Sequence, residues 1–598
     1  MSDAIKPIDA KQSRGGVLTI VDFGEHGNSA IYRREGWSGQ EPRAIWGLGP
    51  RSVLRLTIQP TGRPVVLDAE IDPCRQLPNL RGQIVRVRVN GTAIGAARLD
   101  QRSMIRAWIP PSAQREDGVL EIEFGFPGFL RPKSMRYSGD IRPLSGLFSF
   151  VRAYTQDLLP PGPWCAPTHS NFPVIEVSPP ATPLENPPDA KIAAPAIYRF
   201  GAKGTVVPFL REGWDPGETE FTWTRATCSR LELPAPDAPG TYVMRLEATP
   251  LISPEKLPAQ ELTILLDGIA IGQFTLNEAT TLIVPLPREL TDGRETLPFT
   301  FLLPDASRPK DLGVSSDLRL LGLAVRRIDI LPLPPHLSAV EEIRADQAGR
   351  APAMAASRQF LTEDSGALPA AIEAALGMDP VALLRGFESL GDNCEFGMVQ
   401  RKLGLEVLNL LRFGNAQLPD LMRALTDDLQ AATDPAQVRI TLNDGKRREY
   451  VLALPAYNLR WHTFTFEDES DAETVLRAHS AKLGYLRRKF YEGLRGGRKI
   501  YVMKRLRSIP LAQATAVLIE LSRHGNATLL CVEPAPEGRR PGEVDLLMPG
   551  LMRGYVARFA PASDVGATEP TDWLRVAANA VLLTRGTDAV AGASADAA

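Results

Sequence analysis

Cys394 is the residue whose neighbours in this sequence best suit nucleophilic chemistry. The segment 387–397 reads FESLGDNCEFG, in which a short apolar stretch ends at Gly391 and helical spacing follows the cysteine. We therefore expect Cys394 in the first turn of a helix that emerges from a strand, where unpaired N–H groups and the helix dipole favour the nucleophilic thiolate. Glu395 acts in the opposite direction, because a neighbouring carboxylate raises the pKa of a thiol. The alternative is a small buried cysteine that fills the corner between strand and helix.

A cysteine nucleophile needs a base, and elimination points to His462. This histidine follows a predicted β-hairpin, whereas His479 and His524 fall on predicted helix surfaces. Cys394 and His462 together predict the catalytic pair of a hydrolase or transferase. The alternative is that His462 is a hydrogen-bonded histidine packed beside the tryptophan that precedes it.

A second set of residues suits sugar binding. The spacing Trp-x3-Glu-x4-Trp occurs twice, 177 residues apart, and its members are Trp37, Glu41 and Trp46, then Trp214, Glu218 and Trp223. Aromatic faces stack on pyranose rings, while carboxylates accept directed hydrogen bonds from sugar hydroxyls. The pattern therefore predicts a polysaccharide or glycoconjugate as partner. The alternative is that Trp46 and Trp223 are core anchors, because large aromatic side chains dominate protein cores.

The same offset of 177 residues extends well beyond the tryptophans. It maps Arg34-Glu35-Gly36-Trp37 onto 211–214, Asn90-Gly91 onto 267–268, and Arg131-Pro132-Lys133 onto 308–310. Segment 84–89 alternates apolar and basic residues, as a half-buried strand does, and Asn-Gly favours a type I′ hairpin turn. Short strands separated by turn residues predict two tandem all-β sandwiches of jelly-roll type.

The region from residue 380 follows a different pattern, in which strands and helices alternate. Segments 499–504, 511–523 and 527–532 read as strand, helix and strand, which predicts a mostly parallel sheet in an α/β domain. Before them, Ser470 and Glu473 form a capping box for a helix that reaches Leu494. The basic run 487–489 on this helix is most simply a solvated face, although it could help to hold an anionic substrate.

These patterns divide the chain into seven parts. The predicted boundaries are an N-terminal tail at 1–27, a first sandwich at 28–155, a proline-rich linker at 156–195, a second sandwich at 196–334, a linker at 335–379, the α/β domain at 380–587 and a disordered tail at 588–598.

The motif Ser389-Leu390-Gly391-x-Asn393-Cys394, a helix with Gln400-Arg401 and an aromatic-flanked His462 together resemble a bacterial family described as papain-like cysteine peptidases. The resemblance spans about 200 residues and implies a Cys/His hydrolase, with Asn393 and Arg401 of the motif near the ligand. In that family an acidic residue often follows the histidine, whereas Thr463 follows here, so the third catalytic member stays open. The two sandwiches are similar to the carbohydrate-binding-like modules that accompany bacterial glycan enzymes.

Composition limits the remaining classes of function. A formal net charge of −2 gives no global field for nucleic acid, and the five cysteines and six histidines have no metal-ligand spacing. We expect no cofactor, because no Walker or Rossmann glycine motif is present. With no signal peptide and no long apolar run, we expect a cytoplasmic protein without a membrane span. Two functions remain: a glycan-directed protein with a cysteine-dependent domain, or a non-catalytic glycan-binding or scaffold protein.

Overall fold

The computed structural model describes residues 17–59, 62–74, 79–155, 172–177, 195–333, 337, 355–357, 359–360, 366–391, 393–444, 447–506, 508–561 and 564–595. Cys165 lies outside these residues. The chain divides into two compact units, of which the first comprises Met1–Ala279 with Val284–Pro332 and the second comprises Thr280–Ile283 with Leu333–Ala598.

The first unit begins with a β-sandwich. One sheet has the order β1-β9-β4-β7-β10, with β2 beside β9, and the other has the order β3-β8-β5-β6. The strands of the first sheet are β1 (Val17–Asp22), β2 (Ile45–Leu48), β4 (Val65–Asp72), β7 (Ser103–Ile109), β9 (Leu144–Thr155) and β10 (Val174–Glu176). Those of the second are β3 (Arg51–Thr57), β5 (Gln83–Val89), β6 (Thr92–Leu99) and β8 (Val119–Gly125).

Alternation along the strands builds the core of this first sandwich. In β5, Val85, Val87 and Val89 enter the core, while Arg86 and Arg88 stay partly exposed, as the sequence pattern predicts. β1 lies within the segment that the sequence assigns to a tail, and it pairs with β9. The first sandwich therefore includes residues before 28, because the short run VLTIVD forms an outer strand.

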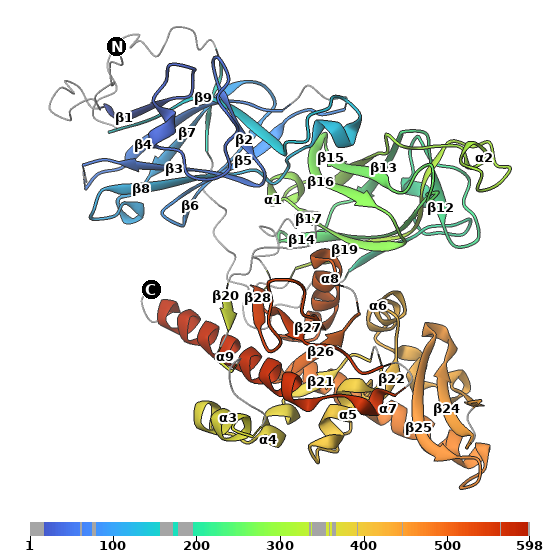
Figure 1. Cartoon of the computed structure of the whole chain (residues 1–598). Helices are drawn as coiled ribbons and strands as arrows, with labels where there is room; N and C mark the ends of the chain where they lie inside the picture. Colours follow the sequence, from blue (N-terminus) through green and yellow to red (C-terminus); the bar gives the residue numbers. More distant parts are fainter. Residues whose placement is uncertain are drawn as a thin grey trace. The chain divides into compact units, whose positions relative to one another are not determined.

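The second sandwich has the strand order of the first. Its sheets run β11-β19-β14-β17, with β12 beside β19, and β13-β18-β15-β16 (Figure 1). The strands are β11 (Ala196–Arg199), β12 (Thr222–Arg225), β13 (Cys228–Pro234), β14 (Tyr242–Pro250), β15 (Gln260–Leu266), β16 (Ile269–Leu276), β17 (Thr280–Leu286), β18 (Thr296–Leu302) and β19 (Leu321–Pro332). Two one-turn helices, α1 (Arg288–Thr291) and α2 (Pro309–Leu312), lie between them.

The 177-residue offset is visible in individual contacts. The isolated bridges Arg33–Leu54, Trp37–Gly47 and Leu130–Leu144 recur as Leu210–Leu231, Trp214–Thr224 and Ser307–Leu321. Trp37 and Trp214 therefore occupy equivalent positions. The hairpin turns also match: φ is +49° and +81° at Asn90-Gly91, and +50° and +74° at Asp267-Gly268. Two consecutive positive φ angles are what a type I′ turn requires.

The second unit is built on a six-stranded sheet of order β20-β28-β29-β27-β26-β21. β21, β26, β27 and β29 are parallel, while β28 and β20 run antiparallel to their neighbours. The strands are β20 (Ala355–Ser357), β21 (Phe387–Ser389), β26 (Ile500–Lys504), β27 (Thr528–Pro534), β28 (Val544–Met548) and β29 (Leu551–Val556). The predicted parallel strand–helix–strand unit corresponds to β26, α8 (Leu511–Ser522) and β27.

One face of this sheet is covered by helices from both ends of the unit. α3 (Leu368–Leu376), α4 (Pro380–Arg385), α5 (Glu395–Lys402) and α9 (Pro570–Ala595) share a core with the sheet. α3 lies in the segment that the sequence assigns to a linker, and α9 continues into the segment assigned to a disordered tail. Both helices are rich in small residues, so their sequences indicate a helix only weakly. Packing stabilises them, because Ile372 and Trp573 are buried.

A four-stranded antiparallel sheet of order β22-β25-β24-β23 adjoins α5 in the chain. Its strands are β22 (Gly414–Asn415), β23 (Arg439–Leu442), β24 (Glu449–Leu454) and β25 (Leu459–Phe466), and it is followed by α7 (Ala472–Gly496). α6 (Leu418–Thr426) lies between β22 and β23 in the sequence. The N-cap of α7 is Asp471, whose carboxylate accepts from Thr474 N at 2.9 Å, so the predicted capping box at Ser470 is wrong by one residue.

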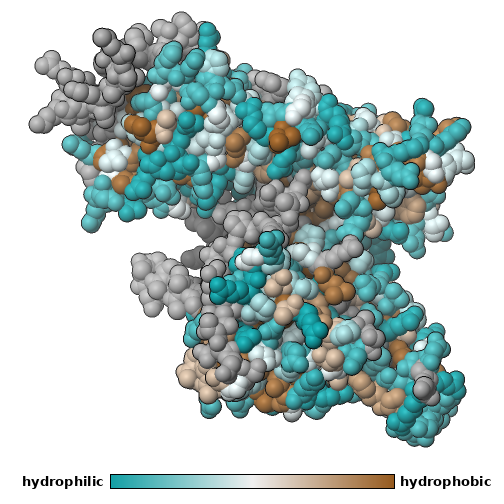
Figure 2. All heavy atoms as spheres, viewed as in Figure 1, coloured by the Kyte–Doolittle hydropathy of each residue, from teal (hydrophilic) through white to brown (hydrophobic). Residues whose placement is uncertain are grey.

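No helix among the described residues is long and apolar enough to cross a membrane. On the face shown in Figure 2, hydrophobic residues occur in small groups among hydrophilic ones in both units. Scattered apolar side chains are normal on a protein surface.

Candidate functional site

Cys394 lies at the corner between β21 and α5, as the sequence predicts. It is the residue that precedes the first residue of α5, and 7% of its surface is exposed. The chain turns at Gly391, where φ is +75° and an added Cβ would lie 3.0 Å from the Leu411 side chain. Asn393 belongs to the turn itself, because its side-chain oxygen accepts a hydrogen bond from Glu395 N at 2.9 Å. Asn393 thus positions the start of the helix.

Glu395 does not act on Cys394 in the predicted way. Its carboxylate is fully buried and pairs with the Lys504 ammonium, with 2.6 Å between Oε2 and Nζ. The other carboxylate oxygen accepts from Ala560 N at 3.0 Å and from the Thr568 hydroxyl at 3.1 Å. Lys504 also lies 4.4 Å from the centre of the Phe559 ring. The charge of Glu395 is therefore neutralised within the fold and joins α5 to the end of β26.

The third member of the constellation is Glu449, at the start of β24. Its Oε2 lies 2.9 Å from His462 Nδ1, and its Oε1 accepts from Phe464 N at 2.8 Å. The two strands lose their regular register between Glu449 and Val451, and Phe464 has φ of +55°. This irregularity turns the Phe464 amide toward the carboxylate. Glu449 is buried, whereas 46% of the His462 side chain is exposed.

Cys394 and His462 meet at the carbonyl of Phe413. The thiol donates to Phe413 O at 3.7 Å, and the backbone N–H of His462 donates to the same oxygen at 3.2 Å. Among the described residues, no hydrogen bond joins the thiol to the imidazole ring. The structure therefore brings the two residues to one backbone group, with the thiol turned toward that group.

The predicted preference for a thiolate is wrong in this structure. The pKa of Cys394 is raised to about 11, first by burial and then by the charge of Glu449, while Arg401 and Lys504 oppose the rise without cancelling it. Desolvation, which disfavours the charged thiolate, is the largest cause of the shift. The carboxylate that disfavours ionisation is Glu449, across the sheet, and not the adjacent Glu395.

Arg401 packs against two aromatic rings next to this site. Its guanidinium is 4.7 Å from the ring centres of both Phe413 and Phe464, and its Nε donates to Glu406 at 2.8 Å. The two phenylalanine rings are 4.9 Å apart at their centres, and Phe464 is exposed. Cys394, Arg401, Phe413, Glu449 and His462 form what we call the Cys394 site.

Sequence reasoning missed Glu449 because its role depends on cross-strand register. The predicted hairpin included the strand that follows Glu449, but nothing local pairs this residue with His462. Among the described residues, no three His, Cys, Asp or Glu side chains are grouped as a metal site.

In the sandwiches, Trp37 and Trp214 act mainly as structural anchors. Their indole N–H groups donate to Val53 O at 2.8 Å and to Arg230 O at 2.7 Å. The Trp37 ring lies about 5 Å from the rings of Phe23 and Phe148, and Trp214 packs in the same way against Phe200 and Phe301. Both tryptophans remain partly exposed.

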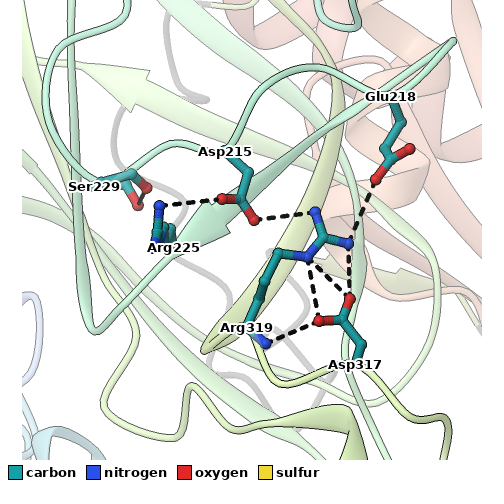
Figure 3. A network of polar contacts seen from close by, with 7 residues as sticks. Asp215, Glu218, Arg225, Ser229, Asp317 and Arg319 are labelled. Carbon is teal, nitrogen blue, oxygen red and sulfur yellow. Dashed lines mark hydrogen bonds and ion pairs between the residues drawn. The ribbon is translucent and has the colours of Figure 1, made fainter.

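The two glutamates of the repeated pattern are ion-paired. Glu41 lies 3.4 Å from Arg142, and Glu218 lies 3.5 Å from Arg319. Figure 3 shows the second copy, in which Arg319 lies between Glu218, Asp317 and Asp215. Both carboxylates that the sequence assigns to a sugar therefore have an arginine beside them and stay partly exposed.

Trp46 and Trp223 occupy equivalent positions in the two copies but differ in their burial. Trp46 is buried against Cys74 and Leu144. Trp223 is half-buried, and its ring is perpendicular to that of Phe221 with 5.9 Å between the centres.

Polar groups flank this aromatic pair. The Arg326 guanidinium lies 5.5 Å from the Phe221 ring centre, and it pairs with Glu220 at 3.2 Å. The 177-residue offset places Ala44 and Ser149 at the positions of Phe221 and Arg326 in the first copy. The complete set therefore occurs in the second copy alone. We call it the Trp223 platform, and it consists of Phe221, Trp223, Arg326 and Glu220.

No protein-family model matches the sequence, and no curated protein matches it. The papain-like resemblance of the second unit thus has no support from a family match.

Solved structures do match parts of the chain. They include the CBM36-1 domain of a multidomain xylanase from the hindgut metagenome of Trinervitermes trinervoides, at 10% identity and TM-score 0.15 over 23% of this chain and 96% of that domain. The C-terminal CBM6 of LamC from Zobellia galactanivorans matches at 12% identity and TM-score 0.14, over 23% of this chain and 99% of that domain. The ANX2 ectodomain from Arabidopsis thaliana matches at 10% identity and TM-score 0.16, over 52% of this chain and 93% of that ectodomain. Carbohydrate-binding-module folds thus occur among the structural neighbours, at scores too low to carry a function.

Proposed function

We propose that the protein is a glycan-directed, cysteine-dependent hydrolase or transferase in which Cys394 is the nucleophile, His462 the base and Glu449 the residue that orients the base. The observation that supports this is the 2.9 Å contact between Glu449 and His462 Nδ1. A carboxylate at Nδ1 holds the proton there and leaves Nε2 free to accept another. Glu449 thus takes the role of third catalytic residue, which the resemblance would give to an acidic residue directly after His462.

The reaction that fits these groups is acyl transfer. Because the thiol is protonated, His462 Nε2 takes the proton as the sulfur attacks a carbonyl carbon, and an Sγ–C bond forms. N–H groups in the first turn of α5 other than that of Glu395, which Asn393 accepts, would stabilise the negative oxygen. The imidazolium then gives its proton to the leaving group. Water, or another hydroxyl or amine, attacks the thioester while His462 takes its proton, and the thiol is restored by proton return.

The step from the observed geometry to this reaction is a rotation of the thiol. Its bond to Phe413 O must give way to one with His462 Nε2, and catalytic hydrogen bonds often tighten only when substrate is bound. The exposed Phe464 ring lies 6.0 Å from the imidazole ring, centre to centre, and the partly exposed Arg401 guanidinium lies over the Phe464 ring, so both are available to a substrate.

The glycan-directed part of the proposal rests on the Trp223 platform. The Trp223 and Phe221 rings offer apolar faces for pyranose stacking, and Arg326 and Glu220 offer a hydrogen-bond donor and an acceptor beside them. Binding is therefore assigned to the second sandwich. In the first, the equivalent tryptophan belongs to a buried cluster.

Hydrolysis of p-nitrophenyl acetate by the full chain tests the catalytic part. Cys394→Ala and His462→Ala should each lower turnover at least tenfold. His479→Ala, which changes a histidine on α7 outside the site, should leave it unchanged. Equal turnover in wild type and Cys394→Ala would exclude the cysteine mechanism.

Affinity electrophoresis of the full chain in polysaccharide gels tests the binding part. Trp223→Ala should abolish retardation by any polysaccharide that retards wild type. Ile197→Ala removes another exposed apolar side chain of the same sheet and should not. Retardation that survives Trp223→Ala would remove the platform from the proposal.

A second function, non-catalytic glycan binding, is favoured by a different observation. The thiol has a pKa near 11, and its hydrogen bond goes to a backbone carbonyl. Both features suit a packing residue. On this alternative the Cys394 site recognises a ligand, and ester turnover is independent of Cys394.

A further inference from the structure

The second unit contains a separate pocket of about 600 Å³. One wall is α7, whose residues Ser480, Gly484, Arg488, Tyr491 and Arg495 line it at intervals of three or four residues. Such spacing places them on one face of the helix. The opposite wall comes from residues 428–435. Arg487 and Arg488 of the basic run that the sequence treats as a solvated face thus line the pocket, whereas Lys489 does not.

The pocket carries more positive charge than its partners neutralise. Asp428 is its carboxylate, and it pairs with His524 Nε2 at 3.0 Å and with Arg523 at 3.8 Å. Arg487 donates to the backbone oxygen of Asp428 at 2.6 Å. Within the part of the chain that the structure describes, Arg488 and Arg495 have no carboxylate at ion-pair distance. These two guanidinium groups are available to an anion.

Two residues that line the pocket carry buried hydroxyl groups without partners among the described residues. Tyr491 and Ser480 are 5% and 7% exposed, and within the described residues neither hydroxyl makes a hydrogen bond. A buried hydroxyl without a protein partner is usually satisfied by a ligand or water, because leaving it unpaired is costly. The neighbouring Tyr485 ring is 40% exposed, with the Arg488 guanidinium 5.6 Å from its centre.

We propose that this pocket binds a small phosphorylated organic molecule. Its phosphate accepts hydrogen bonds from Arg488 and Arg495 and from the hydroxyls of Ser480 and Tyr491, and its organic part stacks on Tyr485. A phosphate monoester has three acceptor oxygens and nearly two negative charges, which matches two guanidinium groups and two hydroxyl donors better than a single carboxylate does. This inference does not depend on the Cys394 site.

Isothermal titration of the full chain tests the inference with three probes: inorganic phosphate, glucose 6-phosphate and adenosine 5′-monophosphate. At least one ester should bind saturably and more tightly than inorganic phosphate. Arg488→Gln combined with Arg495→Gln should weaken that binding at least tenfold. Arg477→Gln, at an exposed arginine of α7 outside the pocket, should change it less than twofold.

Tyr485→Ala separates the two parts of the ligand, and it should weaken the ester while leaving inorganic phosphate unchanged. Which ester binds more tightly shows whether the organic part is a sugar or a nucleoside. Both arginines are surface residues, so the double variant should keep the wild-type circular dichroism and melting temperature. Absence of saturable binding by all three probes, or equal losses in the double variant and in Arg477→Gln, would overturn the inference.

Discussion

Replacing Glu449 by Gln should change the reactivity of Cys394 and the proposed ester turnover in opposite directions. The pKa of Cys394 is raised from 9.0 to about 11 by burial and then by the charge of Glu449. A rise of this size lowers the thiolate fraction at pH 7 about 100-fold. Glutamine keeps the shape of the side chain and removes the charge, so part of the rise should disappear.

The size of the effect follows from the charges involved. Like charges in a partly buried site repel by about 1 kcal/mol once solvent screening is included, which moves the alkylation midpoint of Glu449→Gln roughly 0.7 pH unit lower and speeds alkylation at pH 7 about fivefold. Turnover should instead fall by about 10–100-fold. The glutamine oxygen is held by Phe464 N, so the amide NH2 replaces the carboxylate oxygen at His462 Nδ1 and no longer fixes the catalytic tautomer.

The assay is iodoacetamide alkylation between pH 6 and 11, with the Cys394 peptide quantified by mass spectrometry, alongside p-nitrophenyl acetate turnover. Glu467→Gln is the control, because Glu467 lies just beyond β25 and pairs with Arg448. The control should leave both quantities at wild-type values. A Glu449→Gln chain with an unchanged or higher midpoint, or with undiminished turnover, would refute the electrostatic and catalytic roles given to Glu449.

Three further predictions concern stability and are measured by urea unfolding. Gly391→Ala should destabilise the second unit by about 1–3 kcal/mol, because φ is +75° there and the new methyl would contact Leu411. Lys504→Met should cost about 3–5 kcal/mol, because it leaves the buried Glu395 carboxylate without its cation. Burial raises the pKa of Asp428, but the His524 hydrogen bond and nearby cations lower it by more than burial raises it. The pKa therefore lies below its ordinary value of 3.8. The ionised form therefore stabilises the fold above about pH 4, and this contribution is lost as the pH falls below it. Asp428→Asn should remove that part of the acid dependence.

Local patterns in the sequence predicted the local structure well. Alternation in 84–89, the Asn90-Gly91 turn and the 177-residue offset all depend on neighbouring residues, and each has its counterpart in the strands and turns. The corner at Cys394 was predictable for the same reason. β1 and α3 were missed because short strands and alanine-rich helices have weak signals and are stabilised by tertiary packing.

The chemistry of the candidate sites was less predictable because it depends on distant contacts. Glu395 is next to Cys394 in sequence, but Lys504 neutralises it from another strand. Glu449 raises the pKa of Cys394 from the neighbouring sheet, through a register that no local pattern specifies. Trp46 and Trp223 occupy the same position in the repeated motif. Their surroundings differ because the second copy has Phe221 where the first copy has Ala44.

The most direct test of the catalytic proposal is to trap the acyl group on Cys394. The full chain is mixed with p-nitrophenyl acetate, quenched in acid at successive times and digested for mass spectrometry. The proposed mechanism predicts that acetyl accumulates on Cys394 and is lost by hydrolysis, and that His462→Ala slows both steps. Acetyl distributed over surface lysines with none on Cys394, or acetyl-Cys394 that forms and decays equally fast without His462, would contradict it.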